Sequence, residues 1–97
     1  MSSPKYYRGG TNLTPKLGEV KIDKATGMVL PQRGLSVFDR PDNLDRFGGA
    51  NEVTNLPEGL RIIQRGKDPH HYEIIPATPM PFDEYAELLK QIVLVPV

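Results

Sequence analysis

Ten prolines and nine glycines in 97 residues limit more than any other feature what this chain can fold into. Proline fixes one backbone dihedral angle and lacks an amide hydrogen, while glycine adopts turn conformations that other residues avoid. Both residues therefore interrupt helices and strands, and we expect short elements separated by firm turns. Disorder is the alternative, but the apolar residues are clustered and periodic, which is typical of a folded core.

The chain length predicts a single domain over 1–97, because a second independent core would not fit. Cysteine is absent, which excludes disulfide scaffolds, thiolate zinc sites and cysteine nucleophiles. Small secreted domains usually carry disulfides, so a cytoplasmic working place is favoured. No apolar run reaches membrane-spanning length and residues 1–5 are not apolar, so we expect neither a membrane contact nor a signal peptide.

Apolar alternation and turn residues predict short strands at 5–8, 17–23, 28–30, 34–38, 60–64, 70–75 and 93–97. The clearest helix covers 80–92, where apolar residues recur at three- and four-residue spacing and form one stripe, namely Phe82, Tyr85, Ala86, Leu89 and Ile92. Residues 41–47 predict one or two helical turns, and 49–59 a surface loop. The sum is an α+β domain with one main C-terminal helix.

Two side chains of the strand at 70–75 are candidates for chemistry. His71 and Glu73 project from the same face of a strand, so they could share a proton or a ligand. The alternative is the exposed polar face of a half-buried strand. His70 adds a third polar group, but no further ligand stands nearby, so no metal site is expected.

Three further candidates lie in the first half of the chain. Ser36 interrupts an apolar strand, where it either bonds a backbone carbonyl or lines a cleft. Arg8 precedes Gly9 and Gly10; an arginine suits bidentate phosphate contact, and glycine lets a phosphate approach the backbone. The alternative for the two glycines is a simple turn.

Charge is distributed unevenly along a chain of zero net charge. Residues 1–40 carry seven Lys or Arg against three Asp or Glu, whereas residues 41–97 carry five against nine. A basic half suits a phosphate-bearing ligand, and an acidic half does not suit tracking along a nucleic-acid duplex. Solvated surface faces would produce the same asymmetry.

Two segments together resemble a known family. The segment Gly-Leu-Ser-Val-Phe-Asp-Arg at 34–40 is similar to a Gly-Thr-Ser-Val-Phe-Asp-Arg motif, and the segment at 71–80 resembles a His-Tyr-x-Ile-Met-Pro-Ala-x-Pro-Met motif. Both motifs occur in this order in the type VI secretion toxin family of type-six-exported effector two, which also resembles C-terminal domains of polymorphic toxins. The early Tyr7-Arg8 resembles a Tyr-Arg pair near the start of that toxin.

The resemblance implies a compact ADP-ribosyltransferase-like fold of two small antiparallel sheets around a cleft for NAD. It implies that Arg8, with Gly9, holds phosphate or ribose, that Ser36 steadies the site, and that Glu73 binds a ribose hydroxyl beside His71. Breaking the nicotinamide–ribose bond develops positive charge on the sugar, which a fixed carboxylate stabilises. The Glu-x-Glu pair of arginine-modifying transferases is missing, because position 71 is a histidine.

This reading implies an antibacterial effector that acts in the target-cell cytoplasm by ADP-ribosyl transfer or NAD hydrolysis. Its partners would be a cognate immunity protein and either a secretion machinery or a parent polypeptide that carries it. The first alternative is a ribonuclease toxin, with His70 or His71 as acid and base and with Arg8, Arg61 and Arg65 on phosphate. The second alternative is a non-catalytic interaction module such as an immunity protein.

Overall fold

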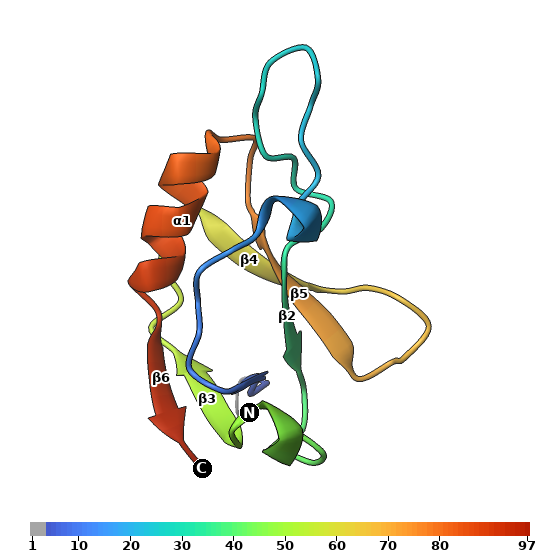
Figure 1. Cartoon of the computed structure of the whole chain (residues 1–97), viewed down its shortest axis with the longest axis vertical. Helices are drawn as coiled ribbons and strands as arrows, with labels where there is room; N and C mark the ends of the chain where they lie inside the picture. Colours follow the sequence, from blue (N-terminus) through green and yellow to red (C-terminus); the bar gives the residue numbers. More distant parts are fainter. Residues whose placement is uncertain (1–3) are drawn as a thin grey trace.

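The computed structural model of the chain describes residues 4–97, and the N-terminal segment considered above lies partly outside this range. Short elements dominate, as the proline and glycine content predicts. Their order is β1 (Tyr7–Gly9), η1 (Leu17–Glu19), β2 (Leu35–Phe38), η2 (Asp45–Phe47), β3 (Ala50–Thr54), β4 (Leu60–Gln64), β5 (His71–Pro76), α1 (Phe82–Lys90) and β6 (Val93–Pro96), where η marks a 3-10 helix. Figure 1 shows these elements along the chain.

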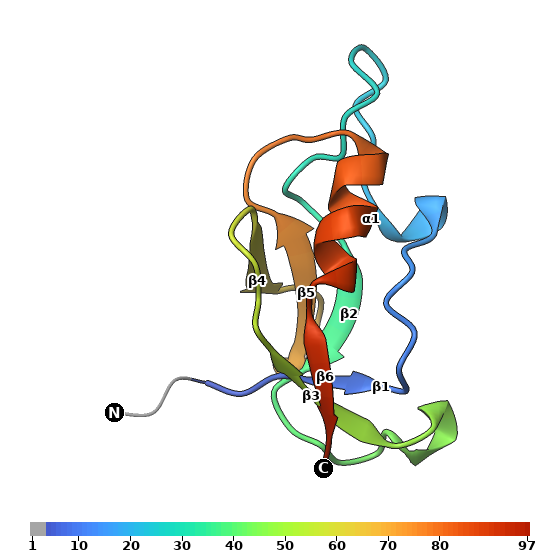
Figure 2. The same cartoon turned by 90° about the vertical axis from the view of Figure 1, so that its left-hand side faces the viewer.

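All six strands belong to one antiparallel sheet in the order β4-β5-β2-β1-β3-β6. This differs from the expected two small sheets. The physical reason is β1, which pairs with β3 along its whole length and with β2 through the single pair Tyr7–Phe38, so it links both halves. Figure 2 shows β1 running across the direction of β2 rather than along it. The ADP-ribosyltransferase-like fold therefore stays a prediction.

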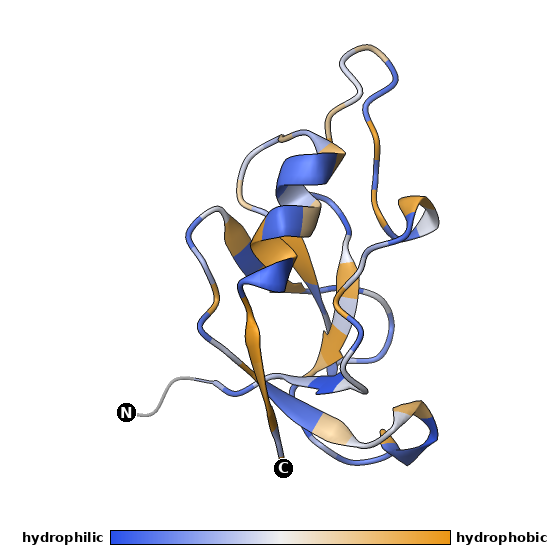
Figure 3. Ribbon diagram, turned by 60° about the vertical axis from the view of Figure 1, so that its left-hand side comes forward, coloured by the Kyte–Doolittle hydropathy of each residue, from blue (hydrophilic) through white to orange (hydrophobic). Residues whose placement is uncertain are grey.

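Helix α1 covers the half of the sheet formed by β4, β5 and β2. Its stripe is confirmed, since Tyr85 and Leu89 are buried, and Figure 3 shows polar residues on the outer side of the helix. Tyr85 lies between two strands: its hydroxyl donates to the Ile74 carbonyl at 2.6 Å and accepts from the Leu35 amide at 3.1 Å. The radius of gyration of 13.0 Å is that of a compact domain of this size.

The segment expected as a surface loop at 49–59 contains a strand. β3 pairs with β1 on one side and with β6 on the other, and it buries Asn51. The sequence at 50–54 does not alternate between apolar and polar residues, because only one of its side chains is fully buried and that side chain is an amide. The loop prediction was therefore wrong for the first half of 49–59.

The strand expected at 17–23 is also wrong, since no strand forms between η1 and β2. Residues Leu17–Glu19 form the 3-10 turn η1, closed by the Glu19 amide on the Lys16 carbonyl at 2.9 Å, and Leu17 is exposed. Of the expected hairpin with 28–30, one bridge remains, between Ile22 and Val29. The other strands agree with their predicted ranges within two residues, and the helical turn expected at 41–47 is confirmed at Asp45–Phe47.

Candidate functional site

The pairing of β2 with β5 brings three of the predicted site residues together, namely Ser36, His71 and Glu73. Ser36 lies opposite Glu73 and Phe38 lies opposite His71 in the antiparallel register. Directly paired residues project to the same side of a sheet, as do residues two apart on one strand. These four side chains therefore share one face. The residues between them, such as Leu35 and Ile74, belong to the core.

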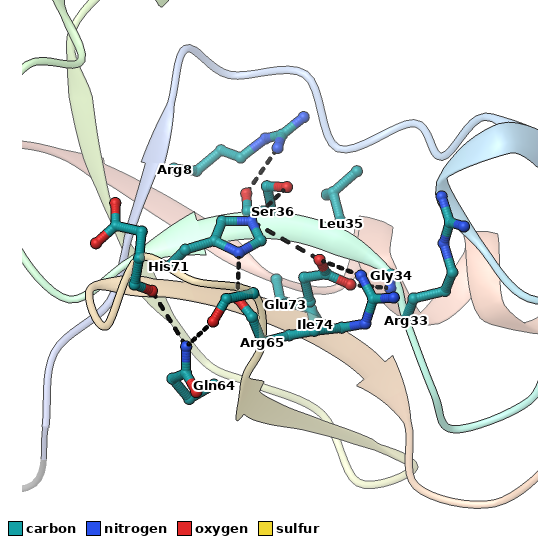
Figure 4. A network of polar contacts seen from close by, with 12 residues as sticks. Arg8, Arg33, Gly34, Leu35, Ser36, Gln64, Arg65, His71, Glu73 and Ile74 are labelled. Carbon is teal, nitrogen blue, oxygen red and sulfur yellow. Dashed lines mark hydrogen bonds and ion pairs between the residues drawn. The ribbon is translucent and has the colours of Figure 1, made fainter.

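Ser36 and His71 form a hydrogen-bonded pair. The Ser36 hydroxyl lies 3.0 Å from His71 Nε2, and His71 Nδ1 lies 2.6 Å from the Arg65 carbonyl oxygen. A carbonyl oxygen only accepts, so Nδ1 carries a proton. In the neutral ring Nε2 is then the acceptor, and the serine hydroxyl donates to it. The pair thus consists of a hydroxyl, an imidazole base and a backbone oxygen that orients the base (Figure 4).

Glu73 lies next to this pair, but it is enclosed. Its side chain is 7% exposed; Oε1 accepts from the Gly34 amide at 2.9 Å and Oε2 from Arg65 Nη1 at 3.3 Å. His71 Nε2 lies 3.7 Å from Oε2, which is close enough for charge attraction when the ring takes up a second proton. Figure 4 shows the carboxylate between the imidazole, Gly34 and Arg65. Glu73 therefore acts on the site through His71 rather than by direct contact with a ligand.

Arg8 reaches β2 from the crossing strand β1. Its Nη1 donates to the Ser36 carbonyl at 2.7 Å, and its Nε donates to the Asn12 carbonyl at 3.1 Å. Burial lowers the pKa of Arg8, an effect that the nearby Glu19 partly opposes. Within residues 4–97 no carboxylate forms an ion pair with this guanidinium. A half-buried cation without an anionic partner is suited to bind an anion.

Arg8, Gly9 and Ser36 line one hollow of about 310 Å³, which we call the Arg8 hollow. Its other walls come from Glu19, Phe38 and Phe47, which the sequence did not indicate as site residues. His71 and Glu73 are not part of the lining; His71 contacts the hollow through the Ser36 hydroxyl. The structure thus brings all five predicted residues into one connected cluster, with three of them at the cavity.

Gly9 has a structural role besides any role in binding. A Cβ at Gly9 would lie 2.8 Å from Phe47 Cβ, so only glycine allows η2 to pack against β1. Asn51 holds the same corner, because its Nδ2 donates to the Gly10 carbonyl at 2.8 Å. Sequence reasoning missed Asn51 and Phe47. The second glycine pair, Gly48-Gly49, was the signal that a tight corner lay here.

The residues of the ribonuclease alternative gather only in part: Arg8, His71 and Arg65 belong to the network around Ser36, whereas His70 and Arg61 are not part of it. His70 faces away from His71 and bonds Asp39, Arg65 bonds Glu73, and the exposed Arg61 does not line the Arg8 hollow. Within the described residues, no three His, Asp or Glu side chains cluster closely enough to hold a metal ion. Of the helices in residues 4–97, none has the length and apolar character needed to cross a membrane.

Comparison with family models, curated proteins and solved structures finds no match to this chain. The chemistry of the site therefore has to be argued from its own geometry. The resemblance to the type VI secretion toxin family rests on the two motifs at 34–40 and 71–80. In the structure these motifs supply the paired strands β2 and β5, and with them Ser36, His71 and Glu73.

Proposed function

We propose that the chain binds NAD in the Arg8 hollow and cleaves its nicotinamide–ribose bond, passing ADP-ribose to water or to an acceptor. One observation carries the proposal: Arg8 and Ser36 line the same hollow, and the Ser36 hydroxyl is hydrogen-bonded to a histidine base at 3.0 Å. An unpaired guanidinium suits a diphosphate, and a hydroxyl on a base suits a ribose hydroxyl or an attacking water.

The proposed roles follow from these contacts. Arg8 binds the diphosphate through the donors that the Ser36 and Asn12 carbonyls leave free. In hydrolysis, water attacks the ribose carbon while the carbon–nitrogen bond breaks and its electron pair leaves with nicotinamide. The proton of the attacking water passes by way of the Ser36 hydroxyl to His71 Nε2. The Arg65 carbonyl keeps the imidazole in the tautomer that accepts this proton.

Glu73 takes a different role from the one that the family resemblance implies. Because its oxygens bond the Gly34 amide and Arg65, it is not free to bind a ribose hydroxyl in this conformation. At 3.7 Å from His71 Nε2 its negative charge stabilises the imidazolium that forms when the ring accepts a proton. Glu73 is therefore a positioning residue in this proposal, and Ser36 and His71 are the catalytic residues.

Release of nicotinamide from NAD by the purified chain, with and without cell lysate as a source of acceptors, tests the proposal. We expect Ser36→Ala and His71→Ala each to lower kcat by about a hundredfold or more, since general-base catalysis contributes at least that much. Arg8→Lys keeps the charge but loses the planar fork, so it should raise KM more than it lowers kcat. Glu73→Gln should lower kcat and leave KM unchanged.

Arg61→Ala is the matched control, because Arg61 is exposed and lines no part of the Arg8 hollow. Circular dichroism and a urea titration of every variant separate loss of catalysis from loss of folding. The proposal fails if the folded wild-type chain releases no nicotinamide either with or without cell lysate. It fails equally if Ser36→Ala and His71→Ala keep the wild-type rate.

The biological setting of the proposal rests on the family resemblance. In this setting the chain is an antibacterial effector that consumes NAD in the target-cell cytoplasm after export by a secretion system or release from a parent polypeptide. The producing cell then needs an immunity protein that closes the Arg8 hollow. Expression in bacteria should stop growth, and Ser36→Ala should restore it; unimpaired growth with active wild-type enzyme present would contradict the toxin role.

A further inference from the structure

A second hollow adjoins the first. It measures about 230 Å³, and it is lined by Arg40, Arg46 and His70 among other residues; we call it the Arg40 hollow. Phe38 and Phe47 line both hollows, so the two cavities adjoin at these residues. Binding pockets for small ligands usually hold about 300–1,000 Å³. The Arg8 hollow is at the lower end of this range and the Arg40 hollow is below it, so the two hollows together suit an extended ligand.

The cations of the Arg40 hollow are available to a ligand. Among residues 4–97 neither Arg40 nor Arg46 forms an ion pair with a carboxylate. Arg46 instead lies over the ring of Phe47, with its guanidinium carbon 4.8 Å from the ring centre. Both arginines are exposed. Each guanidinium has five donors in a planar fork that matches the oxygens of a phosphate group.

The acidic side chains around this hollow are largely engaged by His70. The Asp39 carboxylate accepts from His70 Nδ1 at 2.9 Å, and the Asp68 carboxylate accepts from the His70 amide at 2.9 Å. With its proton on Nδ1, the neutral ring presents Nε2 as an acceptor, and Arg40 donates to it. This contact uses one donor of Arg40. Asp42 and Asp68 both line the hollow, and a hydrogen bond from a neutral amide leaves the charge of Asp68 in place, so the two carboxylates oppose the two arginines in part.

We propose that the Arg40 hollow binds a phosphate group, and that it takes one phosphate-linked half of a dinucleotide whose other half lies in the Arg8 hollow. The inference rests on the proposed function for the substrate, and it adds the second binding site. The two phosphates of a dinucleotide are joined through one oxygen, so the diphosphate crosses the boundary that Phe38 and Phe47 form between the hollows. Arg40 and Arg46 then bind the phosphate of the half that lies in the Arg40 hollow, while Arg8 binds the same diphosphate from the side of the Arg8 hollow.

Binding of ADP-ribose to the whole chain, measured by calorimetry and by amide chemical shifts, tests the inference without any turnover. ADP-ribose should shift amides in both hollows, including those of Arg8, Ser36, Arg46 and His70. Arg40→Ala and Arg46→Ala should each raise the Kd for ADP-ribose about tenfold, which is the loss expected for a charge-assisted hydrogen bond. Arg61→Ala, an exposed arginine outside both hollows, should leave the Kd unchanged.

Two results overturn the inference: shifts confined to the Arg8 hollow, or a wild-type Kd for both Arg40→Ala and Arg46→Ala. A chain that binds no ADP-ribose overturns it as well. The outcome is separable from that of the proposed function. Two-hollow binding without nicotinamide release supports this inference and contradicts NAD cleavage, whereas NAD cleavage with an unchanged KM in Arg40→Ala and Arg46→Ala contradicts this inference alone.

Discussion

Gly34 shows how strongly single residues fix this small domain. Its amide holds the Glu73 carboxylate, and its α-carbon is packed against the Ile74 carbonyl and the Tyr85 hydroxyl. A side chain at this position has no room, since a Cβ would lie 2.5 Å from the Tyr85 oxygen and closer still to the carbonyl. The site and the core therefore meet at one glycine.

Gly34→Ala should destabilise the protein by about 3 kcal/mol or more, because backbone and Tyr85 must both move to admit the methyl group. Urea unfolding followed by circular dichroism measures the effect. Gly18→Ala is the matched control: a Cβ at Gly18 meets nothing within 4 Å, so we expect a change within about 0.5 kcal/mol. Equal stability of the two variants would show that β2 does not pack against Ile74 and Tyr85 as described.

The buried hydroxyl of Tyr85 makes the free energy of unfolding fall at alkaline pH. Burial raises the pKa of its hydroxyl to about 12, from 10.0 in a solvated tyrosine. The unfolded chain therefore loses this proton at a lower pH than the folded chain. The stabilisation is complete below the pKa of the unfolded state and is lost as the pH rises through the pKa of the folded state. The raised pKa corresponds to about 3 kcal/mol.

Unfolding free energies of the wild type and Tyr85→Phe between pH 9 and 12, roughly the window between these values, isolate this contribution. The wild-type stability should fall more steeply than that of the variant, because phenylalanine has no proton to lose. At neutral pH the free energy of unfolding of the variant should be lower by about 1–3 kcal/mol, since the Leu35 amide loses its hydrogen-bond partner. Parallel curves at alkaline pH would contradict a buried hydroxyl.

At the scale of elements, the helices and strands that could be predicted are those with one buried face, because a buried face requires apolar residues at regular spacing in the sequence. α1 was predictable because one face packs on the sheet, and β2 because Leu35 and Val37 alternate with half-buried residues. β3 was not, since it is held by strands on both sides and buries one amide instead of an apolar stripe. Pairing in space, which the local sequence does not record, decides that strand.

The candidate site, too, could be predicted from the sequence only in part. Once the strands at 34–38 and 70–75 are predicted, antiparallel pairing makes a common face for Ser36 and His71 foreseeable. The enclosure of Glu73 was not foreseeable, because it depends on Arg65 from the loop before β5 and on the Gly34 amide. Phe47 and Asn51 join the site through the corner where β1, η2 and β3 meet, which is a tertiary contact.

Asn51 on β3 should matter more than an ordinary strand amide. Asn51→Ala removes a buried side chain and leaves the half-buried Gly10 carbonyl without its side-chain donor, so we expect a loss of about 1–3 kcal/mol and a looser corner around Phe47. Thr54→Ala on the same strand removes a solvent-exposed bond to the Val93 carbonyl, which water replaces at a cost below about 1 kcal/mol. Urea unfolding that ranks the two variants in the opposite order would contradict this role.

For the whole molecule, the sheet consists of two unequal halves. β4, β5 and β2 lie under α1, and together with this helix they supply six of the ten buried residues of the core. β1, β3 and β6 contribute partly buried side chains such as Val53 and Leu94, and they join the first half by the single pair Tyr7–Phe38. Arg8 belongs to the second half and Ser36 to the first, so the Arg8 hollow spans the junction.

Because local opening follows local burial, amide hydrogen exchange should separate these halves. We expect the amides of β5 to exchange slowest and those of β1 and β6 about a hundredfold faster, since opening of β1, β3 and β6 exposes little apolar surface. Leu94→Ala should speed exchange in β1, β3 and β6 and leave β5 unchanged. If all six strands exchange at one rate, the sheet opens as a single unit. A ligand that bridges Arg8 and Ser36 would slow exchange in β1 more than in β5, because it would tie the weaker half to the stronger one.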